Sequence, residues 1–566
     1  MTTGHRRHRV AAMVLLLALL APLGALGQAA SPQTALVNRS VSQEATPANA
    51  GPTWADDAVC YEVLVRSFAD SDGDGIGDLN GLTQKLDYVN DDDPATTTDL
   101  GVTCLWLMPI FQATSYHGYD VEDFERVDPD YGTNEDFERL VAEAHWRGIR
   151  VILDLVLNHT SRNHPWFQEA LNDPASPYRD WYIFSEEDPG YPGPWGAEAW
   201  HRSPVREEYY YGVFWGGMPD LNYRNPAVTA EAERISAFWL NEMGADGFQL
   251  DAIKHLIENG QEQENTAETH AWLRGYRSFL DATAPEAFTV GEVFRASPFL
   301  LAPYYPDQLH SYFGFEVGAQ ILNAANYGGA SGLVSTVEDA LDQLPEQRWA
   351  PFLTNHDQPR TMTVFNGDVG KAKLAATALL TMPGLPFVYY GEEIGMVGTK
   401  PDERIRTPMQ WAAGPVNGFT TGDPWQPLQA DAETVNVAAQ AEDPASLLSH
   451  YRRLIQLHTA HPALAHGDFV PLETSESAVA AFLRQSEEET MLVLLNAGTE
   501  PAGAVSLSGT ETGLAAGIYQ MTSLLGATTT ADLAVEADGS LPDQVLLPIL
   551  APLTGYVFQI QIKAGR

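Results

Sequence analysis

The sequence predicts an α/β protein in which a TIM (β/α)8 barrel carries a small inserted domain after its third strand and is followed by a C-terminal all-β sandwich. Three observations predict this architecture. Short β-branched or aromatic runs alternate with amphipathic stretches that end in glycine, as in parallel β/α units. One connection is far longer than the others, and the C-terminal part changes to short runs of alternating apolar and polar residues.

Eight apolar runs are the candidate barrel strands, and eight β/α units are the number that closes a TIM barrel. These runs lie at residues 59–65, 102–108, 151–157, 246–250, 288–293, 311–317, 350–354 and 385–390. Stretches 134–147 and 226–243 predict two of the intervening helices, because apolar residues recur there every three or four positions and a glycine follows.

The long connection follows the third strand and holds about 65 residues before the next helix, which is more than ordinary barrel loops contain. Its stretch 166–215 has fourteen aromatic residues in fifty, against 10% in the whole chain. A small hydrophobic core and stacking on the apolar faces of sugars explain these rings equally well. The predicted domains are a signal peptide at 1–27, a disordered linker at 28–53, the barrel at 54–159 and 223–463, the inserted domain at 160–222 and the β-sandwich at 464–566.

Composition and charge limit the classes of function. Hydrophobic residues make up 44% of the 566 residues, so the chain can bury a large core. Acidic residues outnumber basic ones by 75 to 32, which gives a formal charge of −43. Nucleic acids and anionic membranes are therefore not expected as partners, since both require a basic surface. We expect a monomer.

The N-terminus predicts export. Arg6, Arg7 and Arg9 precede an uncharged apolar stretch at 11–27 that ends in small residues, which is typical of a secretory signal peptide. A membrane anchor is the alternative, but this stretch is shorter than the ~20 residues that span a bilayer. We therefore expect a secreted protein, extracellular or periplasmic, that has no membrane partner after signal cleavage.

The chain has two cysteines, Cys60 and Cys104, on the first and second candidate strands. A disulfide between neighbouring strands is sterically conceivable in an exported protein. Two buried free thiols are nevertheless the expected state.

Acidic residues stand just beyond the C-terminal ends of three apolar runs: Asp251, Glu292 and Asp357. In a TIM barrel these ends meet at the active site, so we expect the three carboxylates to converge there, together with His159 and His356. A single strand-end Asp is more often a helix cap or a turn residue, but three with two histidines are not explained in that way. Paired carboxylates suit a retaining glycosidase.

Four motifs in order resemble those of the α-amylase family of glycoside hydrolases, family 13, over about residues 54–566. They are Asp154-Leu-Val-Leu-Asn-His159, Gly247-Phe-Gln-Leu-Asp-Ala-Ile-Lys-His255, Gly291-Glu-Val-Phe294 and Asn355-His-Asp357. The resemblance implies that Asp251 is the nucleophile, Glu292 the general acid/base and Asp357 the transition-state stabiliser. It also implies that His159, His356, Tyr119 and Asp120 bind the sugar at the cleavage point.

Two further stretches resemble particular subgroups. Met218-Pro-Asp-Leu-Asn222 is similar to the subgroup intermediate between oligo-1,6-glucosidases and neopullulanases, whereas Arg406-Thr-Pro-Met-Gln-Trp411 resembles the oligo-1,6-glucosidase and trehalose synthase side. Lys254 and His255 resemble the aglycone contacts of endo-acting α-amylases. The implied function is retaining hydrolysis of α-1,4-glucosidic bonds in starch and maltooligosaccharides.

Two alternatives stay open. One is an exo-acting α-glucosidase or oligo-1,6-glucosidase, or a transglycosylase that resembles trehalose synthase. The other is a non-catalytic glycan-binding protein on an amylase fold, which is motivated by Gln249. The family pattern has Arg at this position, two residues before the nucleophile, and no other Arg in the motif is an obvious replacement.

The loop at 70–78 has the ligand spacing of a calcium site. The candidate ligands are the carboxylates of Asp70, Asp72, Asp74 and Asp78 and the carbonyl of Ile76. Gly81 replaces the Glu that would complete an EF-hand, and an acidic surface turn is the alternative explanation. The loop also resembles the metal-binding loop of oligo-1,6-glucosidase-like members. A second calcium, bound by Asn158 as in many α-amylases, is a weaker expectation.

Overall fold

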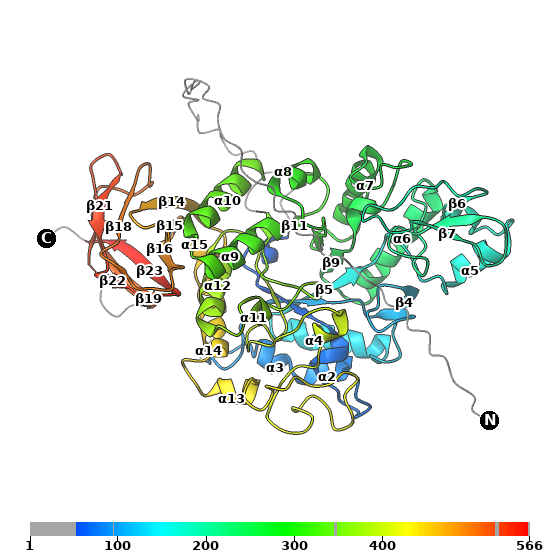
Figure 1. Ribbon diagram of the computed structural model, residues 1–566, viewed down its shortest axis with the longest axis horizontal. Coiled ribbons are helices and arrows are strands. Elements are labelled where there is room, and N and C mark those ends of the chain that lie inside the picture. Colours follow the sequence, from blue (N-terminus) through cyan, green and yellow to red (C-terminus); the bar gives the residue numbers. More distant parts are fainter. Residues whose placement is uncertain (1–51, 94–95, 345–347, 527–530, 564–566) are drawn as a thin grey trace, which may run out of the picture. The chain divides into compact units, whose positions relative to one another are not determined.

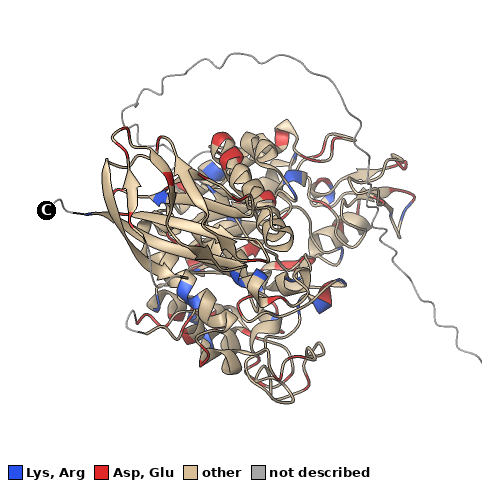
Figure 2. Ribbon diagram, turned by 60° about the vertical axis from the view of Figure 1, so that its left-hand side comes forward, with Lys and Arg blue, Asp and Glu red and all other residues tan. Residues whose placement is uncertain are grey.

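The computed structural model describes residues 52–93, 96–344, 348–526 and 531–563. The predicted signal peptide and nearly all of the predicted linker lie outside these residues. Within the described ranges, no helix is both long enough and apolar enough to cross a bilayer. Acidic residues are spread over many helices and loops (Figure 2).

A parallel sheet of eight strands forms the barrel (Figure 1). In spatial order the strands are β12 (Trp349–Ala350), β11 (Ser311–Phe313), β10 (Phe288–Gly291), β9 (Gly247–Leu250), β5 (Arg150–Leu155), β2 (Cys104–Leu107), β1 (Cys60–Val63) and β13 (Phe387–Tyr389). Phe352, just beyond β12, pairs with Phe387 of β13, so the two end strands meet and close the barrel. Each of the eight predicted runs overlaps one of these strands.

Helices and short strands connect the barrel strands. Those of the first half are α1 (Val65–Phe68), α2 (Leu79–Gln84), α3 (Leu86–Val89), β3 (Phe111–Ala113), β4 (Val121–Val127), α4 (Asn134–Trp146) and α6 (Pro226–Ala237). Those of the second half are α7 (Ala267–Thr283), α8 (Pro298–Leu301), α9 (Phe315–Tyr327), α10 (Ala330–Gln343), α11 (Thr361–Val364), α12 (Val369–Thr381), α13 (Val437–Ala441), α14 (Leu447–Ala460) and α15 (Pro462–Ala465).

The two predicted helices are present. α4 begins with a capping box, in which Thr133 accepts from the N–H of Asp136 and the Asp136 carboxylate accepts from the N–H of Thr133. The second predicted helix is α-helical only to Ala237, because Phe238–Glu242 forms a π-helical turn before Gly244.

The barrel interior is filled by aromatic rings, among them Trp106, Phe313 and Phe387. The expectation of two free thiols is wrong, because Cys60 and Cys104 form a disulfide. The two residues are direct partners in the register of β1 and β2, with their Cα atoms 4.3 Å apart. Paired residues of neighbouring strands point to the same side, which brings the two sulfur atoms together.

The long connection contains its own small elements. They are α5 (Pro165–Asn172), β6 (Phe184–Ser185), β7 (Trp200–Arg202) and β8 (Tyr209–Tyr211), and the three strands form one antiparallel sheet. Trp200, Tyr211 and Val213 are buried together in a separate hydrophobic cluster. Part of the aromatic content of this segment therefore serves a local core.

The C-terminal part is an antiparallel all-β unit with its own core. Its strands are β14 (Asp468–Thr474), β15 (Val479–Gln485), β16 (Thr490–Asn496), β17 (Ala502–Gly503), β18 (Ser506–Gly509), β19 (Gly517–Leu525), β20 (Leu533–Val535), β21 (Leu541–Val545), β22 (Ile549–Leu550) and β23 (Thr554–Ile562). Eight of them form a sheet with β20 and β21 at its two ends. The Gln544 amide bonds the N–H and the carbonyl of Ala534, so the sheet folds back on itself.

Candidate active site

The three predicted carboxylates meet at the C-terminal end of the barrel. Asp251 directly follows β9 and Glu292 directly follows β10, and both line one cavity of about 250 Å³ with Asp357. The N–H of Glu292 donates to the carbonyl of Leu250 at 3.0 Å, so the strand ladder runs up to the site and fixes its backbone. The structure therefore brings the three carboxylates to one cavity, and their roles stay predictions.

The backbone after Asp251 turns sharply. Ala252 has φ +51°, a left-handed conformation that is costly for a residue with a side chain. The chain then enters a short 3-10 helix, Ile253–His255, and this turn brings Lys254 and His255 to the same cavity. Lys254 forms an ion pair with Glu264 at 2.7 Å, and the Nδ1 atom of His255 bonds the carbonyl of Gln263.

Asp357 is held by positive charge. The Arg406 guanidinium donates to Asp357 Oδ1 at 2.7 Å and to the carbonyl of His356 at 3.0 Å. His356 in turn bonds Glu62 of β1, with 2.5 Å between Nδ1 and Oε1. Loss of hydration would raise the pKa of Asp357, but His356 and Arg406 outweigh it and lower that pKa. Asp357 therefore stays ionised.

The surroundings of Asp251 and Glu292 raise the pKa values of these two carboxyl groups instead of lowering them. Loss of hydration raises the pKa of Glu292 well above its usual value, and the negative charges of Asp251 and Asp357 raise it further. Loss of hydration and the charges of Asp154 and Asp357 also raise the pKa of Asp251. With both pKa values raised, this pair can hold a proton while Asp357 holds none.

Tyr119 connects the two sides of the site. Its hydroxyl donates to Asp154 Oδ2 at 2.9 Å and lies 2.7 Å from Nε2 of His356. His159 bonds the carbonyl of Tyr119 through Nε2, and burial lowers the pKa of His159 to about 3, so its ring is neutral. Asp120 is buried nearby and accepts from the N–H and hydroxyl of Ser115.

Gln249 is not bonded to Arg406, the cationic side chain that binds Asp357. Its amide nitrogen donates to Oδ1 at 2.7 Å and to Oδ2 at 3.1 Å of Asp154, its partner in the register of β9 and β5. The positive charge of the site belongs instead to Arg406, which is bound to Asp357. The sequence motif 406–411 contained this residue, but nothing in it indicated a contact with Asp357.

Three aromatic side chains also line the cavity: Trp195 and Phe214, which lie in none of the four motifs, and Phe294, which ends the third motif. Trp195 is 49% exposed, and its ring lies 5.3 Å from that of Phe214 and 5.3 Å from that of His255. Trp195 and Phe214 belong to the segment 166–215, so the aromatic residues there serve the cavity as well as a local core.

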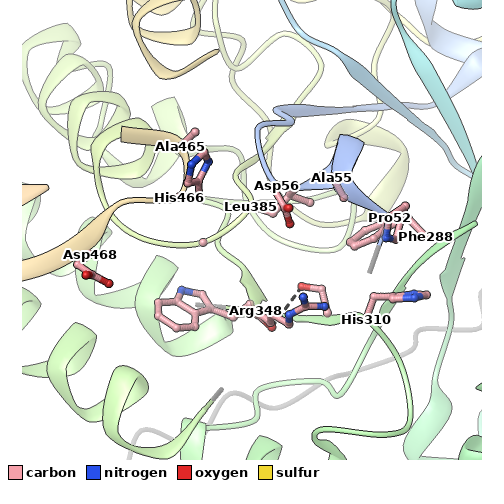
Figure 3. A pocket seen from close by; sticks show the side chains of 13 residues that line it. Pro52, Ala55, Asp56, Phe288, His310, Arg348, Leu385, Ala465, His466 and Asp468 are labelled. Carbon is pink, nitrogen blue, oxygen red and sulfur yellow. Dashed lines mark hydrogen bonds between the residues drawn. The ribbon is translucent and has the colours of Figure 1, made fainter. Parts of the chain in front are cut away.

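A second cavity, of about 360 Å³, lies at the N-terminal ends of the strands (Figure 3). The first residues of β10, β11 and β12 line it together with Arg348 and His310. In Figure 3, Arg348 and His310 lie on one side of this cavity, and Asp56 and His466 on the other. It contains none of the predicted site residues.

The loop at 70–78 brings together three of its predicted carboxylates. Oxygen atoms of Asp70, Asp72 and Asp78 lie within 4.8 Å of one another, and Asp74 is not part of this group. The Asp74 carboxylate instead accepts from the N–H of Ile76 at 2.7 Å. Carboxylate oxygens are hard ligands of the kind that Ca²⁺ takes, and further oxygens would have to complete its usual set of about six to eight.

Comparisons with known proteins agree with this geometry. The family model described as alpha amylase, catalytic domain, matches residues 62–467. The chain is 40% identical over 447 residues to alpha-amylase 3 of Dictyoglomus thermophilum, which covers 78% of this chain and 85% of that protein. It is 35% identical over 519 residues to the trehalose synthase/amylase of Mycobacterium tuberculosis, covering 81% and 84%. Its fold matches the crystal structure of the alpha-amylase from H. orenii with a TM-score of 0.78 and 38% identity, covering 89% and 99%.

Proposed function

Because the chain belongs to the α-amylase family of glycoside hydrolases, we propose that it hydrolyses α-1,4-glucosidic bonds of starch and maltooligosaccharides with retention at the anomeric carbon. The observation that carries this proposal is the unequal state of the three carboxyl groups in one cavity. Asp251 and Glu292 line the cavity with raised pKa values, and Arg406 donates to Asp357, whose pKa is lowered. The non-catalytic alternative is set aside, since the matching family model is a catalytic domain and the relatives are named as enzymes.

The proposed reaction has two displacements. In the first, an oxygen of Asp251 attacks the anomeric carbon while the proton of Glu292 passes to the glycosidic oxygen, which leaves with the aglycone. In the second, Glu292 takes a proton from water, and the water oxygen displaces Asp251 from the sugar. The ionised Asp357 stabilises the positive charge that develops on the ring in both transition states.

The remaining predicted contacts surround this centre. We assign Tyr119, Asp120, His159 and His356 to the sugar whose bond is cleaved. Lys254 and His255 are assigned to the aglycone side, where Trp195 and Phe214 offer apolar faces for the next sugar. Because the His159 ring is neutral and its Nε2 donates to the carbonyl of Tyr119, its Nδ1 can only accept a hydrogen bond.

Product stereochemistry tests the mechanism. Proton NMR of a fresh maltooligosaccharide digest should show the α-anomer first, because two inversions restore the starting configuration. Early accumulation of the β-anomer would contradict the covalent role of Asp251.

Two alternatives remain within the family, because homologues include a trehalose synthase/amylase and an oligo-1,6-glucosidase. Maltooligosaccharides blocked at the non-reducing end distinguish them, since only an endo-acting enzyme cleaves a chain whose end is capped. Isomaltose tests α-1,6 cleavage. Conversion of maltose to trehalose, followed by chromatography, tests the transglycosylase.

We further propose that the 70–78 loop binds Ca²⁺ and stabilises the fold. Asp70, Asp72 and Asp78 provide the carboxylates, and the loop lies outside the cavity that holds Asp251. Asp74 and the carbonyl of Ile76 stay predicted ligands. The ion would orient the loop and takes no part in the reaction steps above.

Unpartnered oxygen atoms support a second cation next to Asn158. Within the described residues, Asn158 Oδ1 and Asp220 Oδ2 are buried without a hydrogen-bond partner. Buried oxygen atoms of this kind fit a hard cation better than they fit an apolar surrounding. If this site binds calcium, titration should find one bound ion fewer in Asp220→Asn than in the unaltered protein.

Export and the monomeric state are also proposals. The basic and apolar N-terminal residues support a signal peptide, and the disulfide between Cys60 and Cys104 is consistent with an oxidising compartment. N-terminal sequencing of the mature protein and light scattering would test these two points.

A further inference from the structure

Glu62 is a buried acid of the barrel, and the proposed reaction gives it no role. It lies on β1, and its side chain is 2% exposed. Its Oε1 atom lies 2.5 Å from Nδ1 of His356 and also accepts from the backbone N–H of that residue at 3.4 Å. Burying a carboxylate is costly unless a partner balances its charge, so the charge of Glu62 depends on the state of the His356 ring.

The hydrogen bonds on the other side of the His356 ring run in one direction. The amide nitrogen of Gln249 donates to both oxygens of Asp154, so Asp154 is an acceptor. The Tyr119 hydroxyl donates to Asp154 Oδ2 at 2.9 Å, and a hydroxyl has one hydrogen to donate. The Tyr119 oxygen must therefore accept in its other contact, which joins it to Nε2 of His356 at 2.7 Å. It follows that Nε2 carries a hydrogen.

The contact between Glu62 and Nδ1 also requires a hydrogen, either on the ring or on the acid. Two observations favour the ring. The same Oε1 atom accepts from the backbone N–H of His356, which suits a carboxylate. Asp357 Oδ2 lies 3.8 Å from Nε2, and a negative charge at this distance favours a positive ring. With hydrogen on both nitrogens, the ring is an imidazolium.

The charges around the ring act in the same sense, with one exception. Loss of hydration would lower the pKa of His356, but the charges of Asp357 and Glu62 outweigh it and raise that pKa, whereas Arg406 opposes them. Burial raises the pKa of Glu62 as well, so a neutral pair with the proton on Glu62 is the state that an experiment has to exclude. The titratable groups that face the pair are Tyr119 between β3 and β4, Glu292 after β10, Asp357 after β12, Tyr389 of β13 and Arg406 in the loop after β13.

We propose that Glu62 is a positioning residue that holds His356 as an imidazolium, and that His356 in turn fixes the Tyr119 hydroxyl toward Asp154 and places a positive charge beside Asp357. The rings of Tyr119 and His356 are stacked with their centroids 5.6 Å apart, so holding one ring in place also orients the other. Glu62 thereby acts on the sugar site without contacting the sugar. This inference rests on the roles proposed for Tyr119 and Asp357.

NMR of protein labelled with ¹⁵N-histidine, without substrate, tests the charge of the ring. At neutral pH both ring nitrogens of His356 should carry hydrogen in the unaltered protein, and the signals are assigned by their loss in His356→Asn. In Glu62→Gln one of these hydrogens should be lost, because an amide has no charge to balance the cation. Glu62→Asp keeps the negative charge and should keep both hydrogens.

Glu393→Gln is the matched control for these spectra. Glu393 is also a buried acid, but it accepts from the hydroxyls of Tyr61 and Tyr88, so its variant should leave the His356 signals unchanged. An Nδ1 atom without hydrogen in the unaltered protein would overturn the proposal, whether or not Glu62→Gln folds. Two ring hydrogens that persist in folded Glu62→Gln would also overturn it. Because no substrate is present, this result does not depend on the proposed reaction.

A double-mutant cycle tests whether Glu62 acts through His356. Glu62→Gln should lower kcat/KM for a maltooligosaccharide by about tenfold, which is the usual effect of losing a hydrogen bond to a charged group. In the His356→Asn background the same change should cost less than about twofold, since the partner of Glu62 is already absent. Losses that multiply in the double variant would reject the proposal. An imidazolium in a protein that cleaves no maltooligosaccharide would instead refute the proposed function.

Discussion

At the C-terminal ends of the barrel strands, carboxyl groups outnumber the cations bonded to them, whereas the N-terminal ends carry mixed charges around a cavity that is larger. The N-terminal cavity has about 360 Å³ and the C-terminal one about 250 Å³. Arg348, Asp56 and His466 surround the former, and His466 is paired with Asp57. The size of a cavity therefore does not identify the reactive end. Unbalanced charge in an enclosed space identifies the reactive end, because it shifts pKa values, and acid–base chemistry requires such shifts.

The largest expected effect separates the two ends. Asp251→Asn should lower kcat by about 10⁴-fold or more, because an amide cannot form the covalent intermediate. Asp56→Asn, a matched change at the N-terminal cavity, should leave kcat within about twofold, as most substitutions far from the reacting atoms do. Steady-state kinetics of both purified variants check this. An equal loss of kcat in Asp56→Asn and Asp251→Asn would contradict the difference between the two ends.

The next prediction concerns the cation of the reactive end. Arg406→Met should lower kcat/KM by about a hundredfold, because Asp357 would lose a charged partner in a partly buried site. The pKa of Asp357 would rise, and since activity requires the ionised form, the acid limb of kcat/KM should move to higher pH. Arg404→Met, at an exposed position two residues away, is the control. An unmoved acid limb in a folded Arg406→Met variant would mean that His356 alone holds Asp357 ionised.

Much of this arrangement could be predicted from the sequence. The positions of Asp251 and Glu292 follow from strand ends in a barrel, because β/α periodicity fixes which end of each strand faces the site. Arg406 could not be placed in the same way, since its contact with Asp357 depends on a long loop whose path has no periodic signal. Glu62 was overlooked, although a single acid in the run 59–65 is a signal that its side chain faces other polar groups.

The disulfide was mispredicted for a related reason. Cys60 and Cys104 were assigned to neighbouring strands, but bonding depends on register, and one residue of slip would turn one sulfur to the other face. The structure pairs the two residues directly. Loop geometry and register are the properties that local sequence specifies least.

The N-terminal end should control stability more than activity. Cys60 and Cys104 are the first residues of β1 and β2, so the disulfide lies at that end. Replacing both by Ala should lower the free energy of unfolding by about 2–4 kcal/mol, because the unfolded chain loses a cross-link. Denaturant melts measure this change, and kcat at low temperature should stay the same. A large loss of kcat in the folded double variant would mean that the N-terminal end of the barrel also controls activity, which contradicts this prediction.

The smallest expected effect belongs to the 70–78 loop, which lies apart from the reacting groups. An ion that binds the folded state alone raises stability by mass action, by about 1.4 kcal/mol when its concentration is ten times Kd. EDTA should therefore lower Tm, and Asp72→Ala should do the same in calcium. Glu487→Ala, another exposed acid, is the control for removing a negative charge.

The sign of this effect separates an ion site from an acidic turn. Oxygen atoms of Asp70, Asp72 and Asp78 lie close together, so without a cation their repulsion destabilises the loop, and removing one charge should raise Tm or leave it unchanged. With a bound cation, the same substitution removes a ligand and lowers Tm. A Tm that is insensitive to EDTA and that does not fall in Asp72→Ala would therefore identify the loop as an acidic turn, whereas a fall in both, with kcat in the cold preserved, would identify a structural calcium site.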